Sequence, residues 1–197
     1  ASDREHPAKR LRPIAAGALR PGAALAGALL LVGASVGLGS LVGRGFPFLL
    51  LSYFVLMLAY SFALKKVPVL DAMVIATGFV LRVLGGAEAV RVPASHWLIV
   101  CAFLLALYMA FAKRRQELLS LADSASNHRP VLGEYSIAYL EQVNTILIGA
   151  TMVCYAVYTV APDTVARFGT DRLLYGAVFV IYGLFRYMAL AQNTSLT

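Results

Sequence analysis

Residues 67–90, VPVLDAMVIATGFVLRVLGGAEAV, form an apolar run long enough to cross a membrane as one helix. A helix needs about 20 mainly apolar residues to span a hydrocarbon core of roughly 30 Å. Of the 197 residues, 60% are hydrophobic, and the mean hydropathy of +0.75 is far above that of a soluble domain. Comparable runs lie at 21–43, 46–64, 95–112, 136–161 and 171–191. The sequence therefore predicts an all-α, polytopic transmembrane helix bundle with about six spans.

Two of the ionisable side chains in this run, Asp71 and Arg82, are costly at membrane depth. Eleven positions separate them, so they share a helix face, but a rise of about 1.5 Å per residue places them roughly 16 Å apart. They cannot pair, and each needs another partner. Two interpretations of Asp71 stay open: compensation of the helix dipole near its N-terminus, or contact with substrate or metal. For Arg82 we expect a cavity-facing role rather than a structural ion pair.

Basic residues are unequally divided between the two sides of the predicted spans, although the formal charge is only +7 overall. One side holds Arg44, Arg91, Arg167 and Arg172, and Arg82 and Arg186 lie within spans. By the positive-inside rule, the richer side faces the cytoplasm. That side holds Arg4, Lys9, Arg10, Arg12, Arg20, Lys65, Lys66, Lys113, Arg114, Arg115 and Arg129.

The longest segment between spans begins with KRRQELLSLAD at Lys113, and it lacks a helix breaker, so we expect it to continue the 95–112 helix. Arg114 and Glu117 share a face, and Lys113 lies four residues before Glu117. A basic collar whose side chains reach to the interface is an alternative explanation for Lys113 and Arg115. The mixture of cations and acids favours a polyanionic phosphate substrate with Mg²⁺, whereas a purely basic patch would indicate anionic lipid.

The opening segment, ASDREHPAKRLRPIAAG at 1–17, resembles the downstream end of the first Asp-rich motif of the UbiA superfamily of intramembrane prenyl-group enzymes. That motif runs N-D-x-x-D-x-x-x-D and closes in R-P. Asp3 corresponds to its last Asp and Arg12-Pro13 to the closing pair, while the earlier acids fall before residue 1. Stretches at 60–86, 112–123, 128–143 and 168–187 are similar to one branch, the decaprenyl-phosphate phosphoribosyltransferase-like proteins.

Such proteins generally have nine spans, so the resemblance implies that two precede Ala1, that one follows Thr197, and that the chain is a fragment. It implies one membrane domain over 1–197, with 1–20 as a cytoplasmic first-motif segment and 113–135 as a cytoplasmic second-motif loop. That loop departs from the acid-rich second motif of prenyltransferases that act on aromatic rings. Its basic character suggests a substrate richer in phosphate than a prenyl diphosphate.

The resemblance implies transfer of 5-phosphoribosyl from phosphoribosyl pyrophosphate to a decaprenyl-type polyprenyl phosphate, with release of pyrophosphate. Mg²⁺ is the implied cofactor and Asp3 its ligand, with Asp3, Lys9 and Arg12 as the catalytic residues. The lipid bilayer is the expected surrounding, and no nucleic-acid partner is expected. The expected substrate-binding residues are Arg4, His6, Arg10, Lys65, Lys66, Asp71, Arg82, Lys113, Arg114, Glu117, His128, Arg129 and Tyr135.

Three alternatives remain at this point. The same fold could move a prenyl group from a prenyl diphosphate to a small acceptor, although the basic loop argues against it. A transporter could line its path with Asp71, Arg82 and Arg186, but no inverted repeat is visible. A chain without the upstream acids could also be inert.

Overall fold

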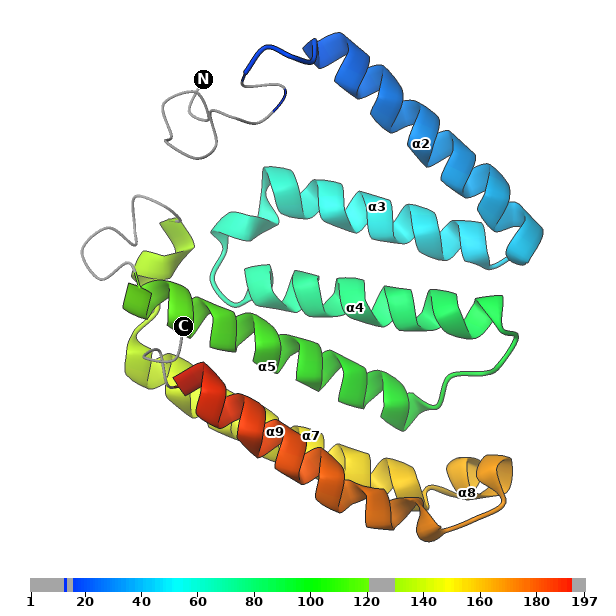
Figure 1. Cartoon of the computed structure of the whole chain (residues 1–197), viewed down its shortest axis with the longest axis vertical. Helices are drawn as coiled ribbons and strands as arrows, with labels where there is room; N and C mark the ends of the chain where they lie inside the picture. The colour runs from blue at the N-terminus through cyan, green and yellow to red at the C-terminus, as the bar shows by residue number, and fades with distance from the viewer. Residues whose placement is uncertain (1–12, 14–15, 121–129, 193–197) are drawn as a thin grey trace. The chain divides into compact units, whose positions relative to one another are not determined.

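The computed structural model describes residues 13, 16–120 and 130–192, and within these residues it contains helices and no strand (Figure 1). The all-α prediction is therefore confirmed. The α-helices are α2 (Pro21–Val42), α3 (Phe46–Phe62), α4 (Leu70–Ala89), α5 (His96–Ser120), α7 (Ile137–Val160), α8 (Pro162–Phe168) and α9 (Ala177–Gln192). Short 3-10 helices are η2 (Leu64–Lys66), η3 (Pro130–Glu134) and η4 (Arg172–Gly176).

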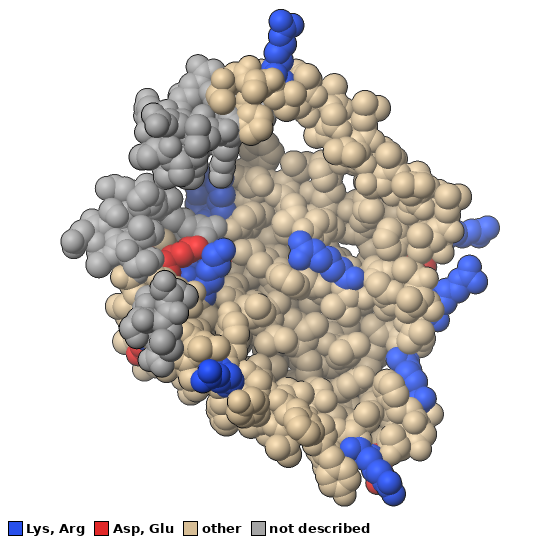
Figure 2. Space-filling view, in the orientation of Figure 1, with Lys and Arg blue, Asp and Glu red and all other residues tan. Residues whose placement is uncertain are grey.

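Among the residues just given, five segments are long and apolar enough to cross a membrane: α2, α4, α5, α7 and Arg172–Gln192, which joins η4 to α9. The chain is thus a multi-pass membrane protein. The remaining predicted span, 46–64, is shorter than expected, because α3 has 17 residues and the backbone tightens into η2 after it. Most of the surface drawn in Figure 2 is uncharged, as expected for helices that face hydrocarbon.

The chain divides into two compact units, Ala1–Phe48 and Leu49–Thr197. In the first unit, α2 turns back at its C-terminal end so that the ring of Phe46 lies against Gly39. A Cβ atom added at Gly39 would lie 2.9 Å from Phe46 Cδ1, so this contact requires a residue without a side chain. It anchors the start of α3.

In the second unit, α5 contacts α4 on one side and α7 on the other, and α9 packs on α7 (Figure 1). The buried face of α4 contains small residues, among them Ala72, Ala76 and Gly78, so neighbouring helix backbones can approach closely. The core is completed by larger side chains from the other helices, among them Tyr108, Phe111, Leu140, Leu147, Ile148 and Leu184.

Two local structures bear on the predictions between the spans. The helix that begins at His96 continues to Ser120, which confirms that the KRRQELLS segment extends it. The stretch between the predicted spans 136–161 and 171–191 holds α8. Pro162 is the first residue of α8, and Gly169 ends the helix in the left-handed conformation, with φ 65°.

Candidate functional site

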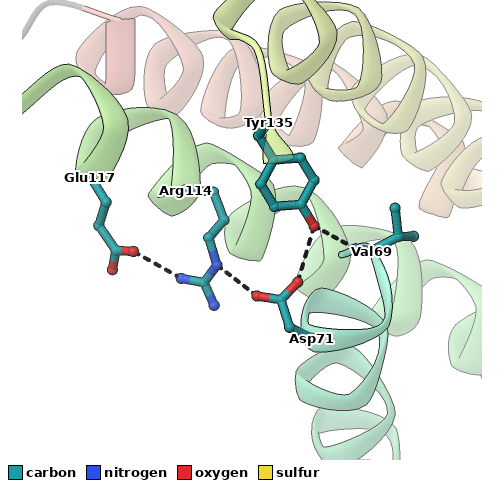
Figure 3. A network of polar contacts seen from close by, with 5 residues as sticks. All are labelled: Val69, Asp71, Arg114, Glu117 and Tyr135. Atoms are coloured by element: carbon teal, nitrogen blue, oxygen red, sulfur yellow. Dashed lines mark hydrogen bonds and ion pairs between the residues drawn. The ribbon is translucent and has the colours of Figure 1, made fainter. Parts of the chain in front are cut away.

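A buried ion pair joins the beginning of α4 to the last turns of α5 (Figure 3). Arg114 Nε donates to Asp71 Oδ2 at 2.9 Å, and the two side chains are 2% and 0% exposed. Arg114 Nη1 also donates to Glu117 Oε2 at 3.2 Å, as the three-residue spacing predicts. The pair supplies the partner that Asp71 was expected to need, and Asp71 also lies in the first turn of α4, where an acid suits the dipole.

Tyr135, just before α7, completes this network. Its hydroxyl donates to Asp71 Oδ1 at 3.1 Å and accepts the backbone N–H of Val69. Burial raises the pKa of Tyr135 to about 12, with a smaller opposing effect from the Val69 hydrogen bond. The hydroxyl therefore keeps its proton at neutral pH and stays a donor to the carboxylate. Ser136 beside it caps α7 by accepting from the N–H of Tyr139 at 3.1 Å.

The exposed cations of this region come from two elements. Lys65 and Lys66 lie in η2, and Lys113 lies one residue before Arg114 on α5. We call the region formed by Lys65, Lys66, Lys113, Arg114 and Arg115 the basic end. Its lysines are exposed, whereas Arg114 is enclosed with its acids. Exposed ammonium groups beside a fixed helix end can bind phosphate oxygens.

Arg82 lies on α4, away from this network. It is exposed and donates a hydrogen bond to the hydroxyl of Tyr53 on α3. Its guanidinium carbon is 4.9 Å from the ring centroids of both Tyr53 and Phe79, a cation–π arrangement. Asp71 and Arg82 therefore have separate partners, as the spacing predicts, and the partners of Arg82 are aromatic.

The remaining predicted site residues lie outside the described residues: Asp3, Arg4, His6, Lys9, Arg10, Arg12, His128 and Arg129. Within the residues that are described, no three His, Cys, Asp or Glu side chains gather where they could hold a metal ion. Asp71 is also engaged by Arg114 and Tyr135. The described part of the site does not fit a metal by itself, and the predicted Mg²⁺ depends on Asp3.

Comparison with known proteins decides the family. The model of the UbiA prenyltransferase family matches residues 1–196, almost the whole chain. The chain belongs to this family. The resemblance carried by the motifs is thus confirmed, and the helical bundle described above is the membrane fold of a UbiA-family protein.

Three relatives of this UbiA-family chain are named decaprenyl-phosphate phosphoribosyltransferase. The protein of Corynebacterium glutamicum is 36% identical over 159 residues, covering 80% of this chain and 48% of the relative. That of Mycolicibacterium smegmatis is 34% identical over 162 residues, covering 82% and 51%. That of Mycobacterium tuberculosis is 30% identical over 162 residues, covering 82% and 54%. The chain spans about half the length of the curated relatives it matches.

One polar contact of this UbiA-family chain was missed by the sequence interpretation. Arg115, for which an interfacial collar was one of two explanations, donates to Glu141 Oε1 on α7 through Nη2 at 2.7 Å and through Nε at 3.1 Å. Glu141 is the only acid in the predicted span 136–161, and an isolated acid within a span needs a partner. The isolated acid therefore indicates that Glu141 has a cationic partner, but the sequence does not show which of the nearby cations it is.

Proposed function

We propose that this UbiA-family protein transfers a 5-phosphoribosyl group from phosphoribosyl pyrophosphate to a decaprenyl-type polyprenyl phosphate and releases pyrophosphate. The names of three relatives at 30–36% identity support this reaction. We also propose that the reaction takes place at the cytoplasmic face of a bacterial inner membrane, where the excess of Lys and Arg would lie.

The observation that carries the proposal is the group of exposed cations at the basic end. Lys65 and Lys66 precede α4, and Lys113, on α5, directly follows the apolar stretch 95–112. Both substrates are anionic at pH 7, and the lipid substrate must present its phosphate at the edge of the hydrocarbon. Cations at a helix end and next to an apolar surface suit that requirement.

The proposed phosphoribosyl transfer depends mainly on stabilising the charge that develops in the transition state. As the bond between the anomeric carbon and pyrophosphate breaks, negative charge grows on the leaving group, and ammonium groups of Lys65 and Lys66 would stabilise it. The acceptor phosphate is already an anion, so attack needs no strong base.

Mg²⁺ belongs to the proposal through Asp3, which is the last acid of the family motif in this chain. Bound there, it would neutralise charge on the pyrophosphate. An Asp3→Asn variant of the complete gene product should lose the Mg²⁺-dependent transfer activity. Equal activity of the two proteins would remove Asp3 from the metal site.

The test is a transfer assay with labelled phosphoribosyl pyrophosphate and decaprenyl phosphate, in membranes that carry the complete gene product. A double variant, Lys65→Gln with Lys66→Gln, should lower kcat/KM about 10- to 100-fold, the range expected when charged hydrogen bonds are lost. Arg172→Gln, at the opposite end of the helices, is the matched control and should stay near wild type. Prenyl transfer from a prenyl diphosphate, or solute flux without turnover, would overturn the proposal.

A further inference from the structure

The link between η2 and α4 contains a strained turn. Val69 has φ 66° and ψ −47°, and the N–H of Leu70 donates to the carbonyl of Pro68 at 2.7 Å. A hydrogen bond across one residue with these angles defines a γ-turn of the positive-φ kind, which is rare and strained. For a β-branched residue such a conformation is an outlier. It persists only where surrounding contacts hold it.

The contact that holds this turn comes from a distant part of the chain. The hydroxyl of Tyr135, 66 residues away, accepts the N–H of Val69 and donates to Asp71 two residues further on (Figure 3). Asp71 is fixed in turn by Arg114. Tyr135 itself is held by packing, since its ring lies edge-on to Phe111 and stacks on Tyr139. One hydroxyl thus bridges the strained residue and the buried ion pair.

The turn also sets the direction of the lysine pair. Only Val67, Pro68 and Val69 join Lys66 to α4, and the ring of Pro68 fixes one of their torsions. The N–H of Asp71 donates to the carbonyl of Val67 at 3.1 Å, so this link is tied to the first turn of α4. If Val69 relaxed to an ordinary extended conformation, η2 would turn away from its contacts with α4 and η3.

We infer that Tyr135 is a positioning residue, which holds the Val69 turn and thereby fixes Lys65 and Lys66 where they bind phosphate. The phosphate part of this inference rests on the proposed function. Tyr135 and Asp71 are 6% and 0% exposed, so they act behind the binding surface and not as direct ligands of a substrate. This differs from the sequence-based expectation that both bind substrate.

The decisive variant is Tyr135→Phe, which removes the hydroxyl and keeps the ring. Tyr139→Phe makes the same chemical change in the neighbouring ring and is the matched control. A third protein combines Tyr135→Phe with Val69→Gly, because glycine adopts positive φ without steric cost. All three changes are made in the complete gene product, purified in detergent.

Two measurements need no turnover. Hydrogen exchange of a peptide covering 64–73 should be about tenfold faster in Tyr135→Phe than in wild type, and unchanged in Tyr139→Phe. Acetylation of Lys65 and Lys66, followed by mass spectrometry, reports protection by inorganic pyrophosphate. Tyr135→Phe should need about tenfold more pyrophosphate for half protection, a loss of the size expected for one hydrogen bond. The variant with Val69→Gly should recover part of it.

Unchanged hydrogen exchange in Tyr135→Phe would show that the Tyr135 hydroxyl does not hold the Val69 turn. Equal protection of the lysines in wild type and Tyr135→Phe would overturn the positioning role, as would an equal loss in Tyr139→Phe. The transfer assay on the wild-type protein tests the proposed reaction separately. If transfer is absent while exchange and protection change as expected, the phosphoribosyl reaction is rejected and the positioning of an anion site by Tyr135 stands.

Discussion

Asp71 shows what a single residue can and cannot disclose in a sequence. Its place in an apolar run predicts a partner, since an unpaired carboxylate is costly there. The partner, Arg114, lies 43 residues away on another helix. Three consecutive cations, Lys113, Arg114 and Arg115, compete for that role in the sequence. Which one turns inward depends on the rotation of α5 against α4, and that follows from packing along both helices.

The Asp71–Arg114 pair permits a sharp stability test. Arg114→Met leaves the buried Asp71 carboxylate without its cation, and Asp71→Leu leaves the buried Arg114 with the partly exposed Glu117 alone. Each should lower the free energy of unfolding by about 3–5 kcal/mol. The double variant should lose much less than the sum of the two, because no buried charge remains. Reversible denaturation in detergent micelles measures all three.

Arg115→Met is the control for that cycle. It breaks an ion pair whose acid, Glu141, is 47% exposed, so its cost should be about 0–1 kcal/mol. Strict additivity of the Asp71 and Arg114 variants would show that the two side chains do not interact in the folded protein.

At the scale of elements, length and apolar character predicted where helices lie better than where they end. The spans at 67–90 and 136–161 correspond to α4 and α7 within a few residues. The sequence did not indicate α8, because Pro162 and Gly169 are common in turns and are also the usual residues at the two ends of a helix. A segment of seven residues gives too little periodicity to decide between these readings.

The contact of α5, α7 and α9 contains an orphaned polar group. Asn144 on α7 is 8% exposed, and its Oδ1 has no hydrogen-bond partner among the residues that the structure describes. The same holds for Nη1 of Arg115 on α5. Both residues line a cavity of about 20 Å³, together with Met188 and Ala191 of α9. An unpaired buried amide costs stability, and the cavity leaves room for a larger side chain.

Asn144→Leu should therefore raise the free energy of unfolding by about 1 kcal/mol, as removal of an unsatisfied polar group allows. Thermal unfolding in detergent, followed by intrinsic fluorescence, measures the change. Thr145→Leu is the control, because Thr145 lies on the exposed side of α7 and its hydroxyl bonds to the carbonyl of Glu141 within the helix. A lower melting temperature for Asn144→Leu would contradict the assignment of Asn144 as an unsatisfied group.

For the whole molecule, hydropathy and the motif stretches predicted the class and the family, and both are confirmed. What they left open is the arrangement at the basic end. The strained turn at Val69 and the bridge from Tyr135 arise only when η2, η3, α4 and α5 meet. A β-branched residue such as Val69 favours an extended backbone, and tertiary contacts overrule that preference here.

The predicted orientation of the bundle can be tested at the two ends of α7. With 24 residues, α7 is about 36 Å long, enough to separate its ends across a bilayer. Glu134 lies before it and Asp171 beyond it, and both are exposed acids. Each is changed to cysteine in a background with Cys101→Ala and Cys154→Ala, so that no other thiol reacts. In cells whose outer membrane has been removed, an impermeant maleimide should label Asp171→Cys at once and Glu134→Cys only after permeabilisation. The richer set of Lys and Arg would hold the Glu134 end in the cytoplasm. The cysteine-free background controls for reaction elsewhere. Labelling of Glu134→Cys in intact cells would reverse the topology and place the basic end, with its proposed phosphate site, on the outer face.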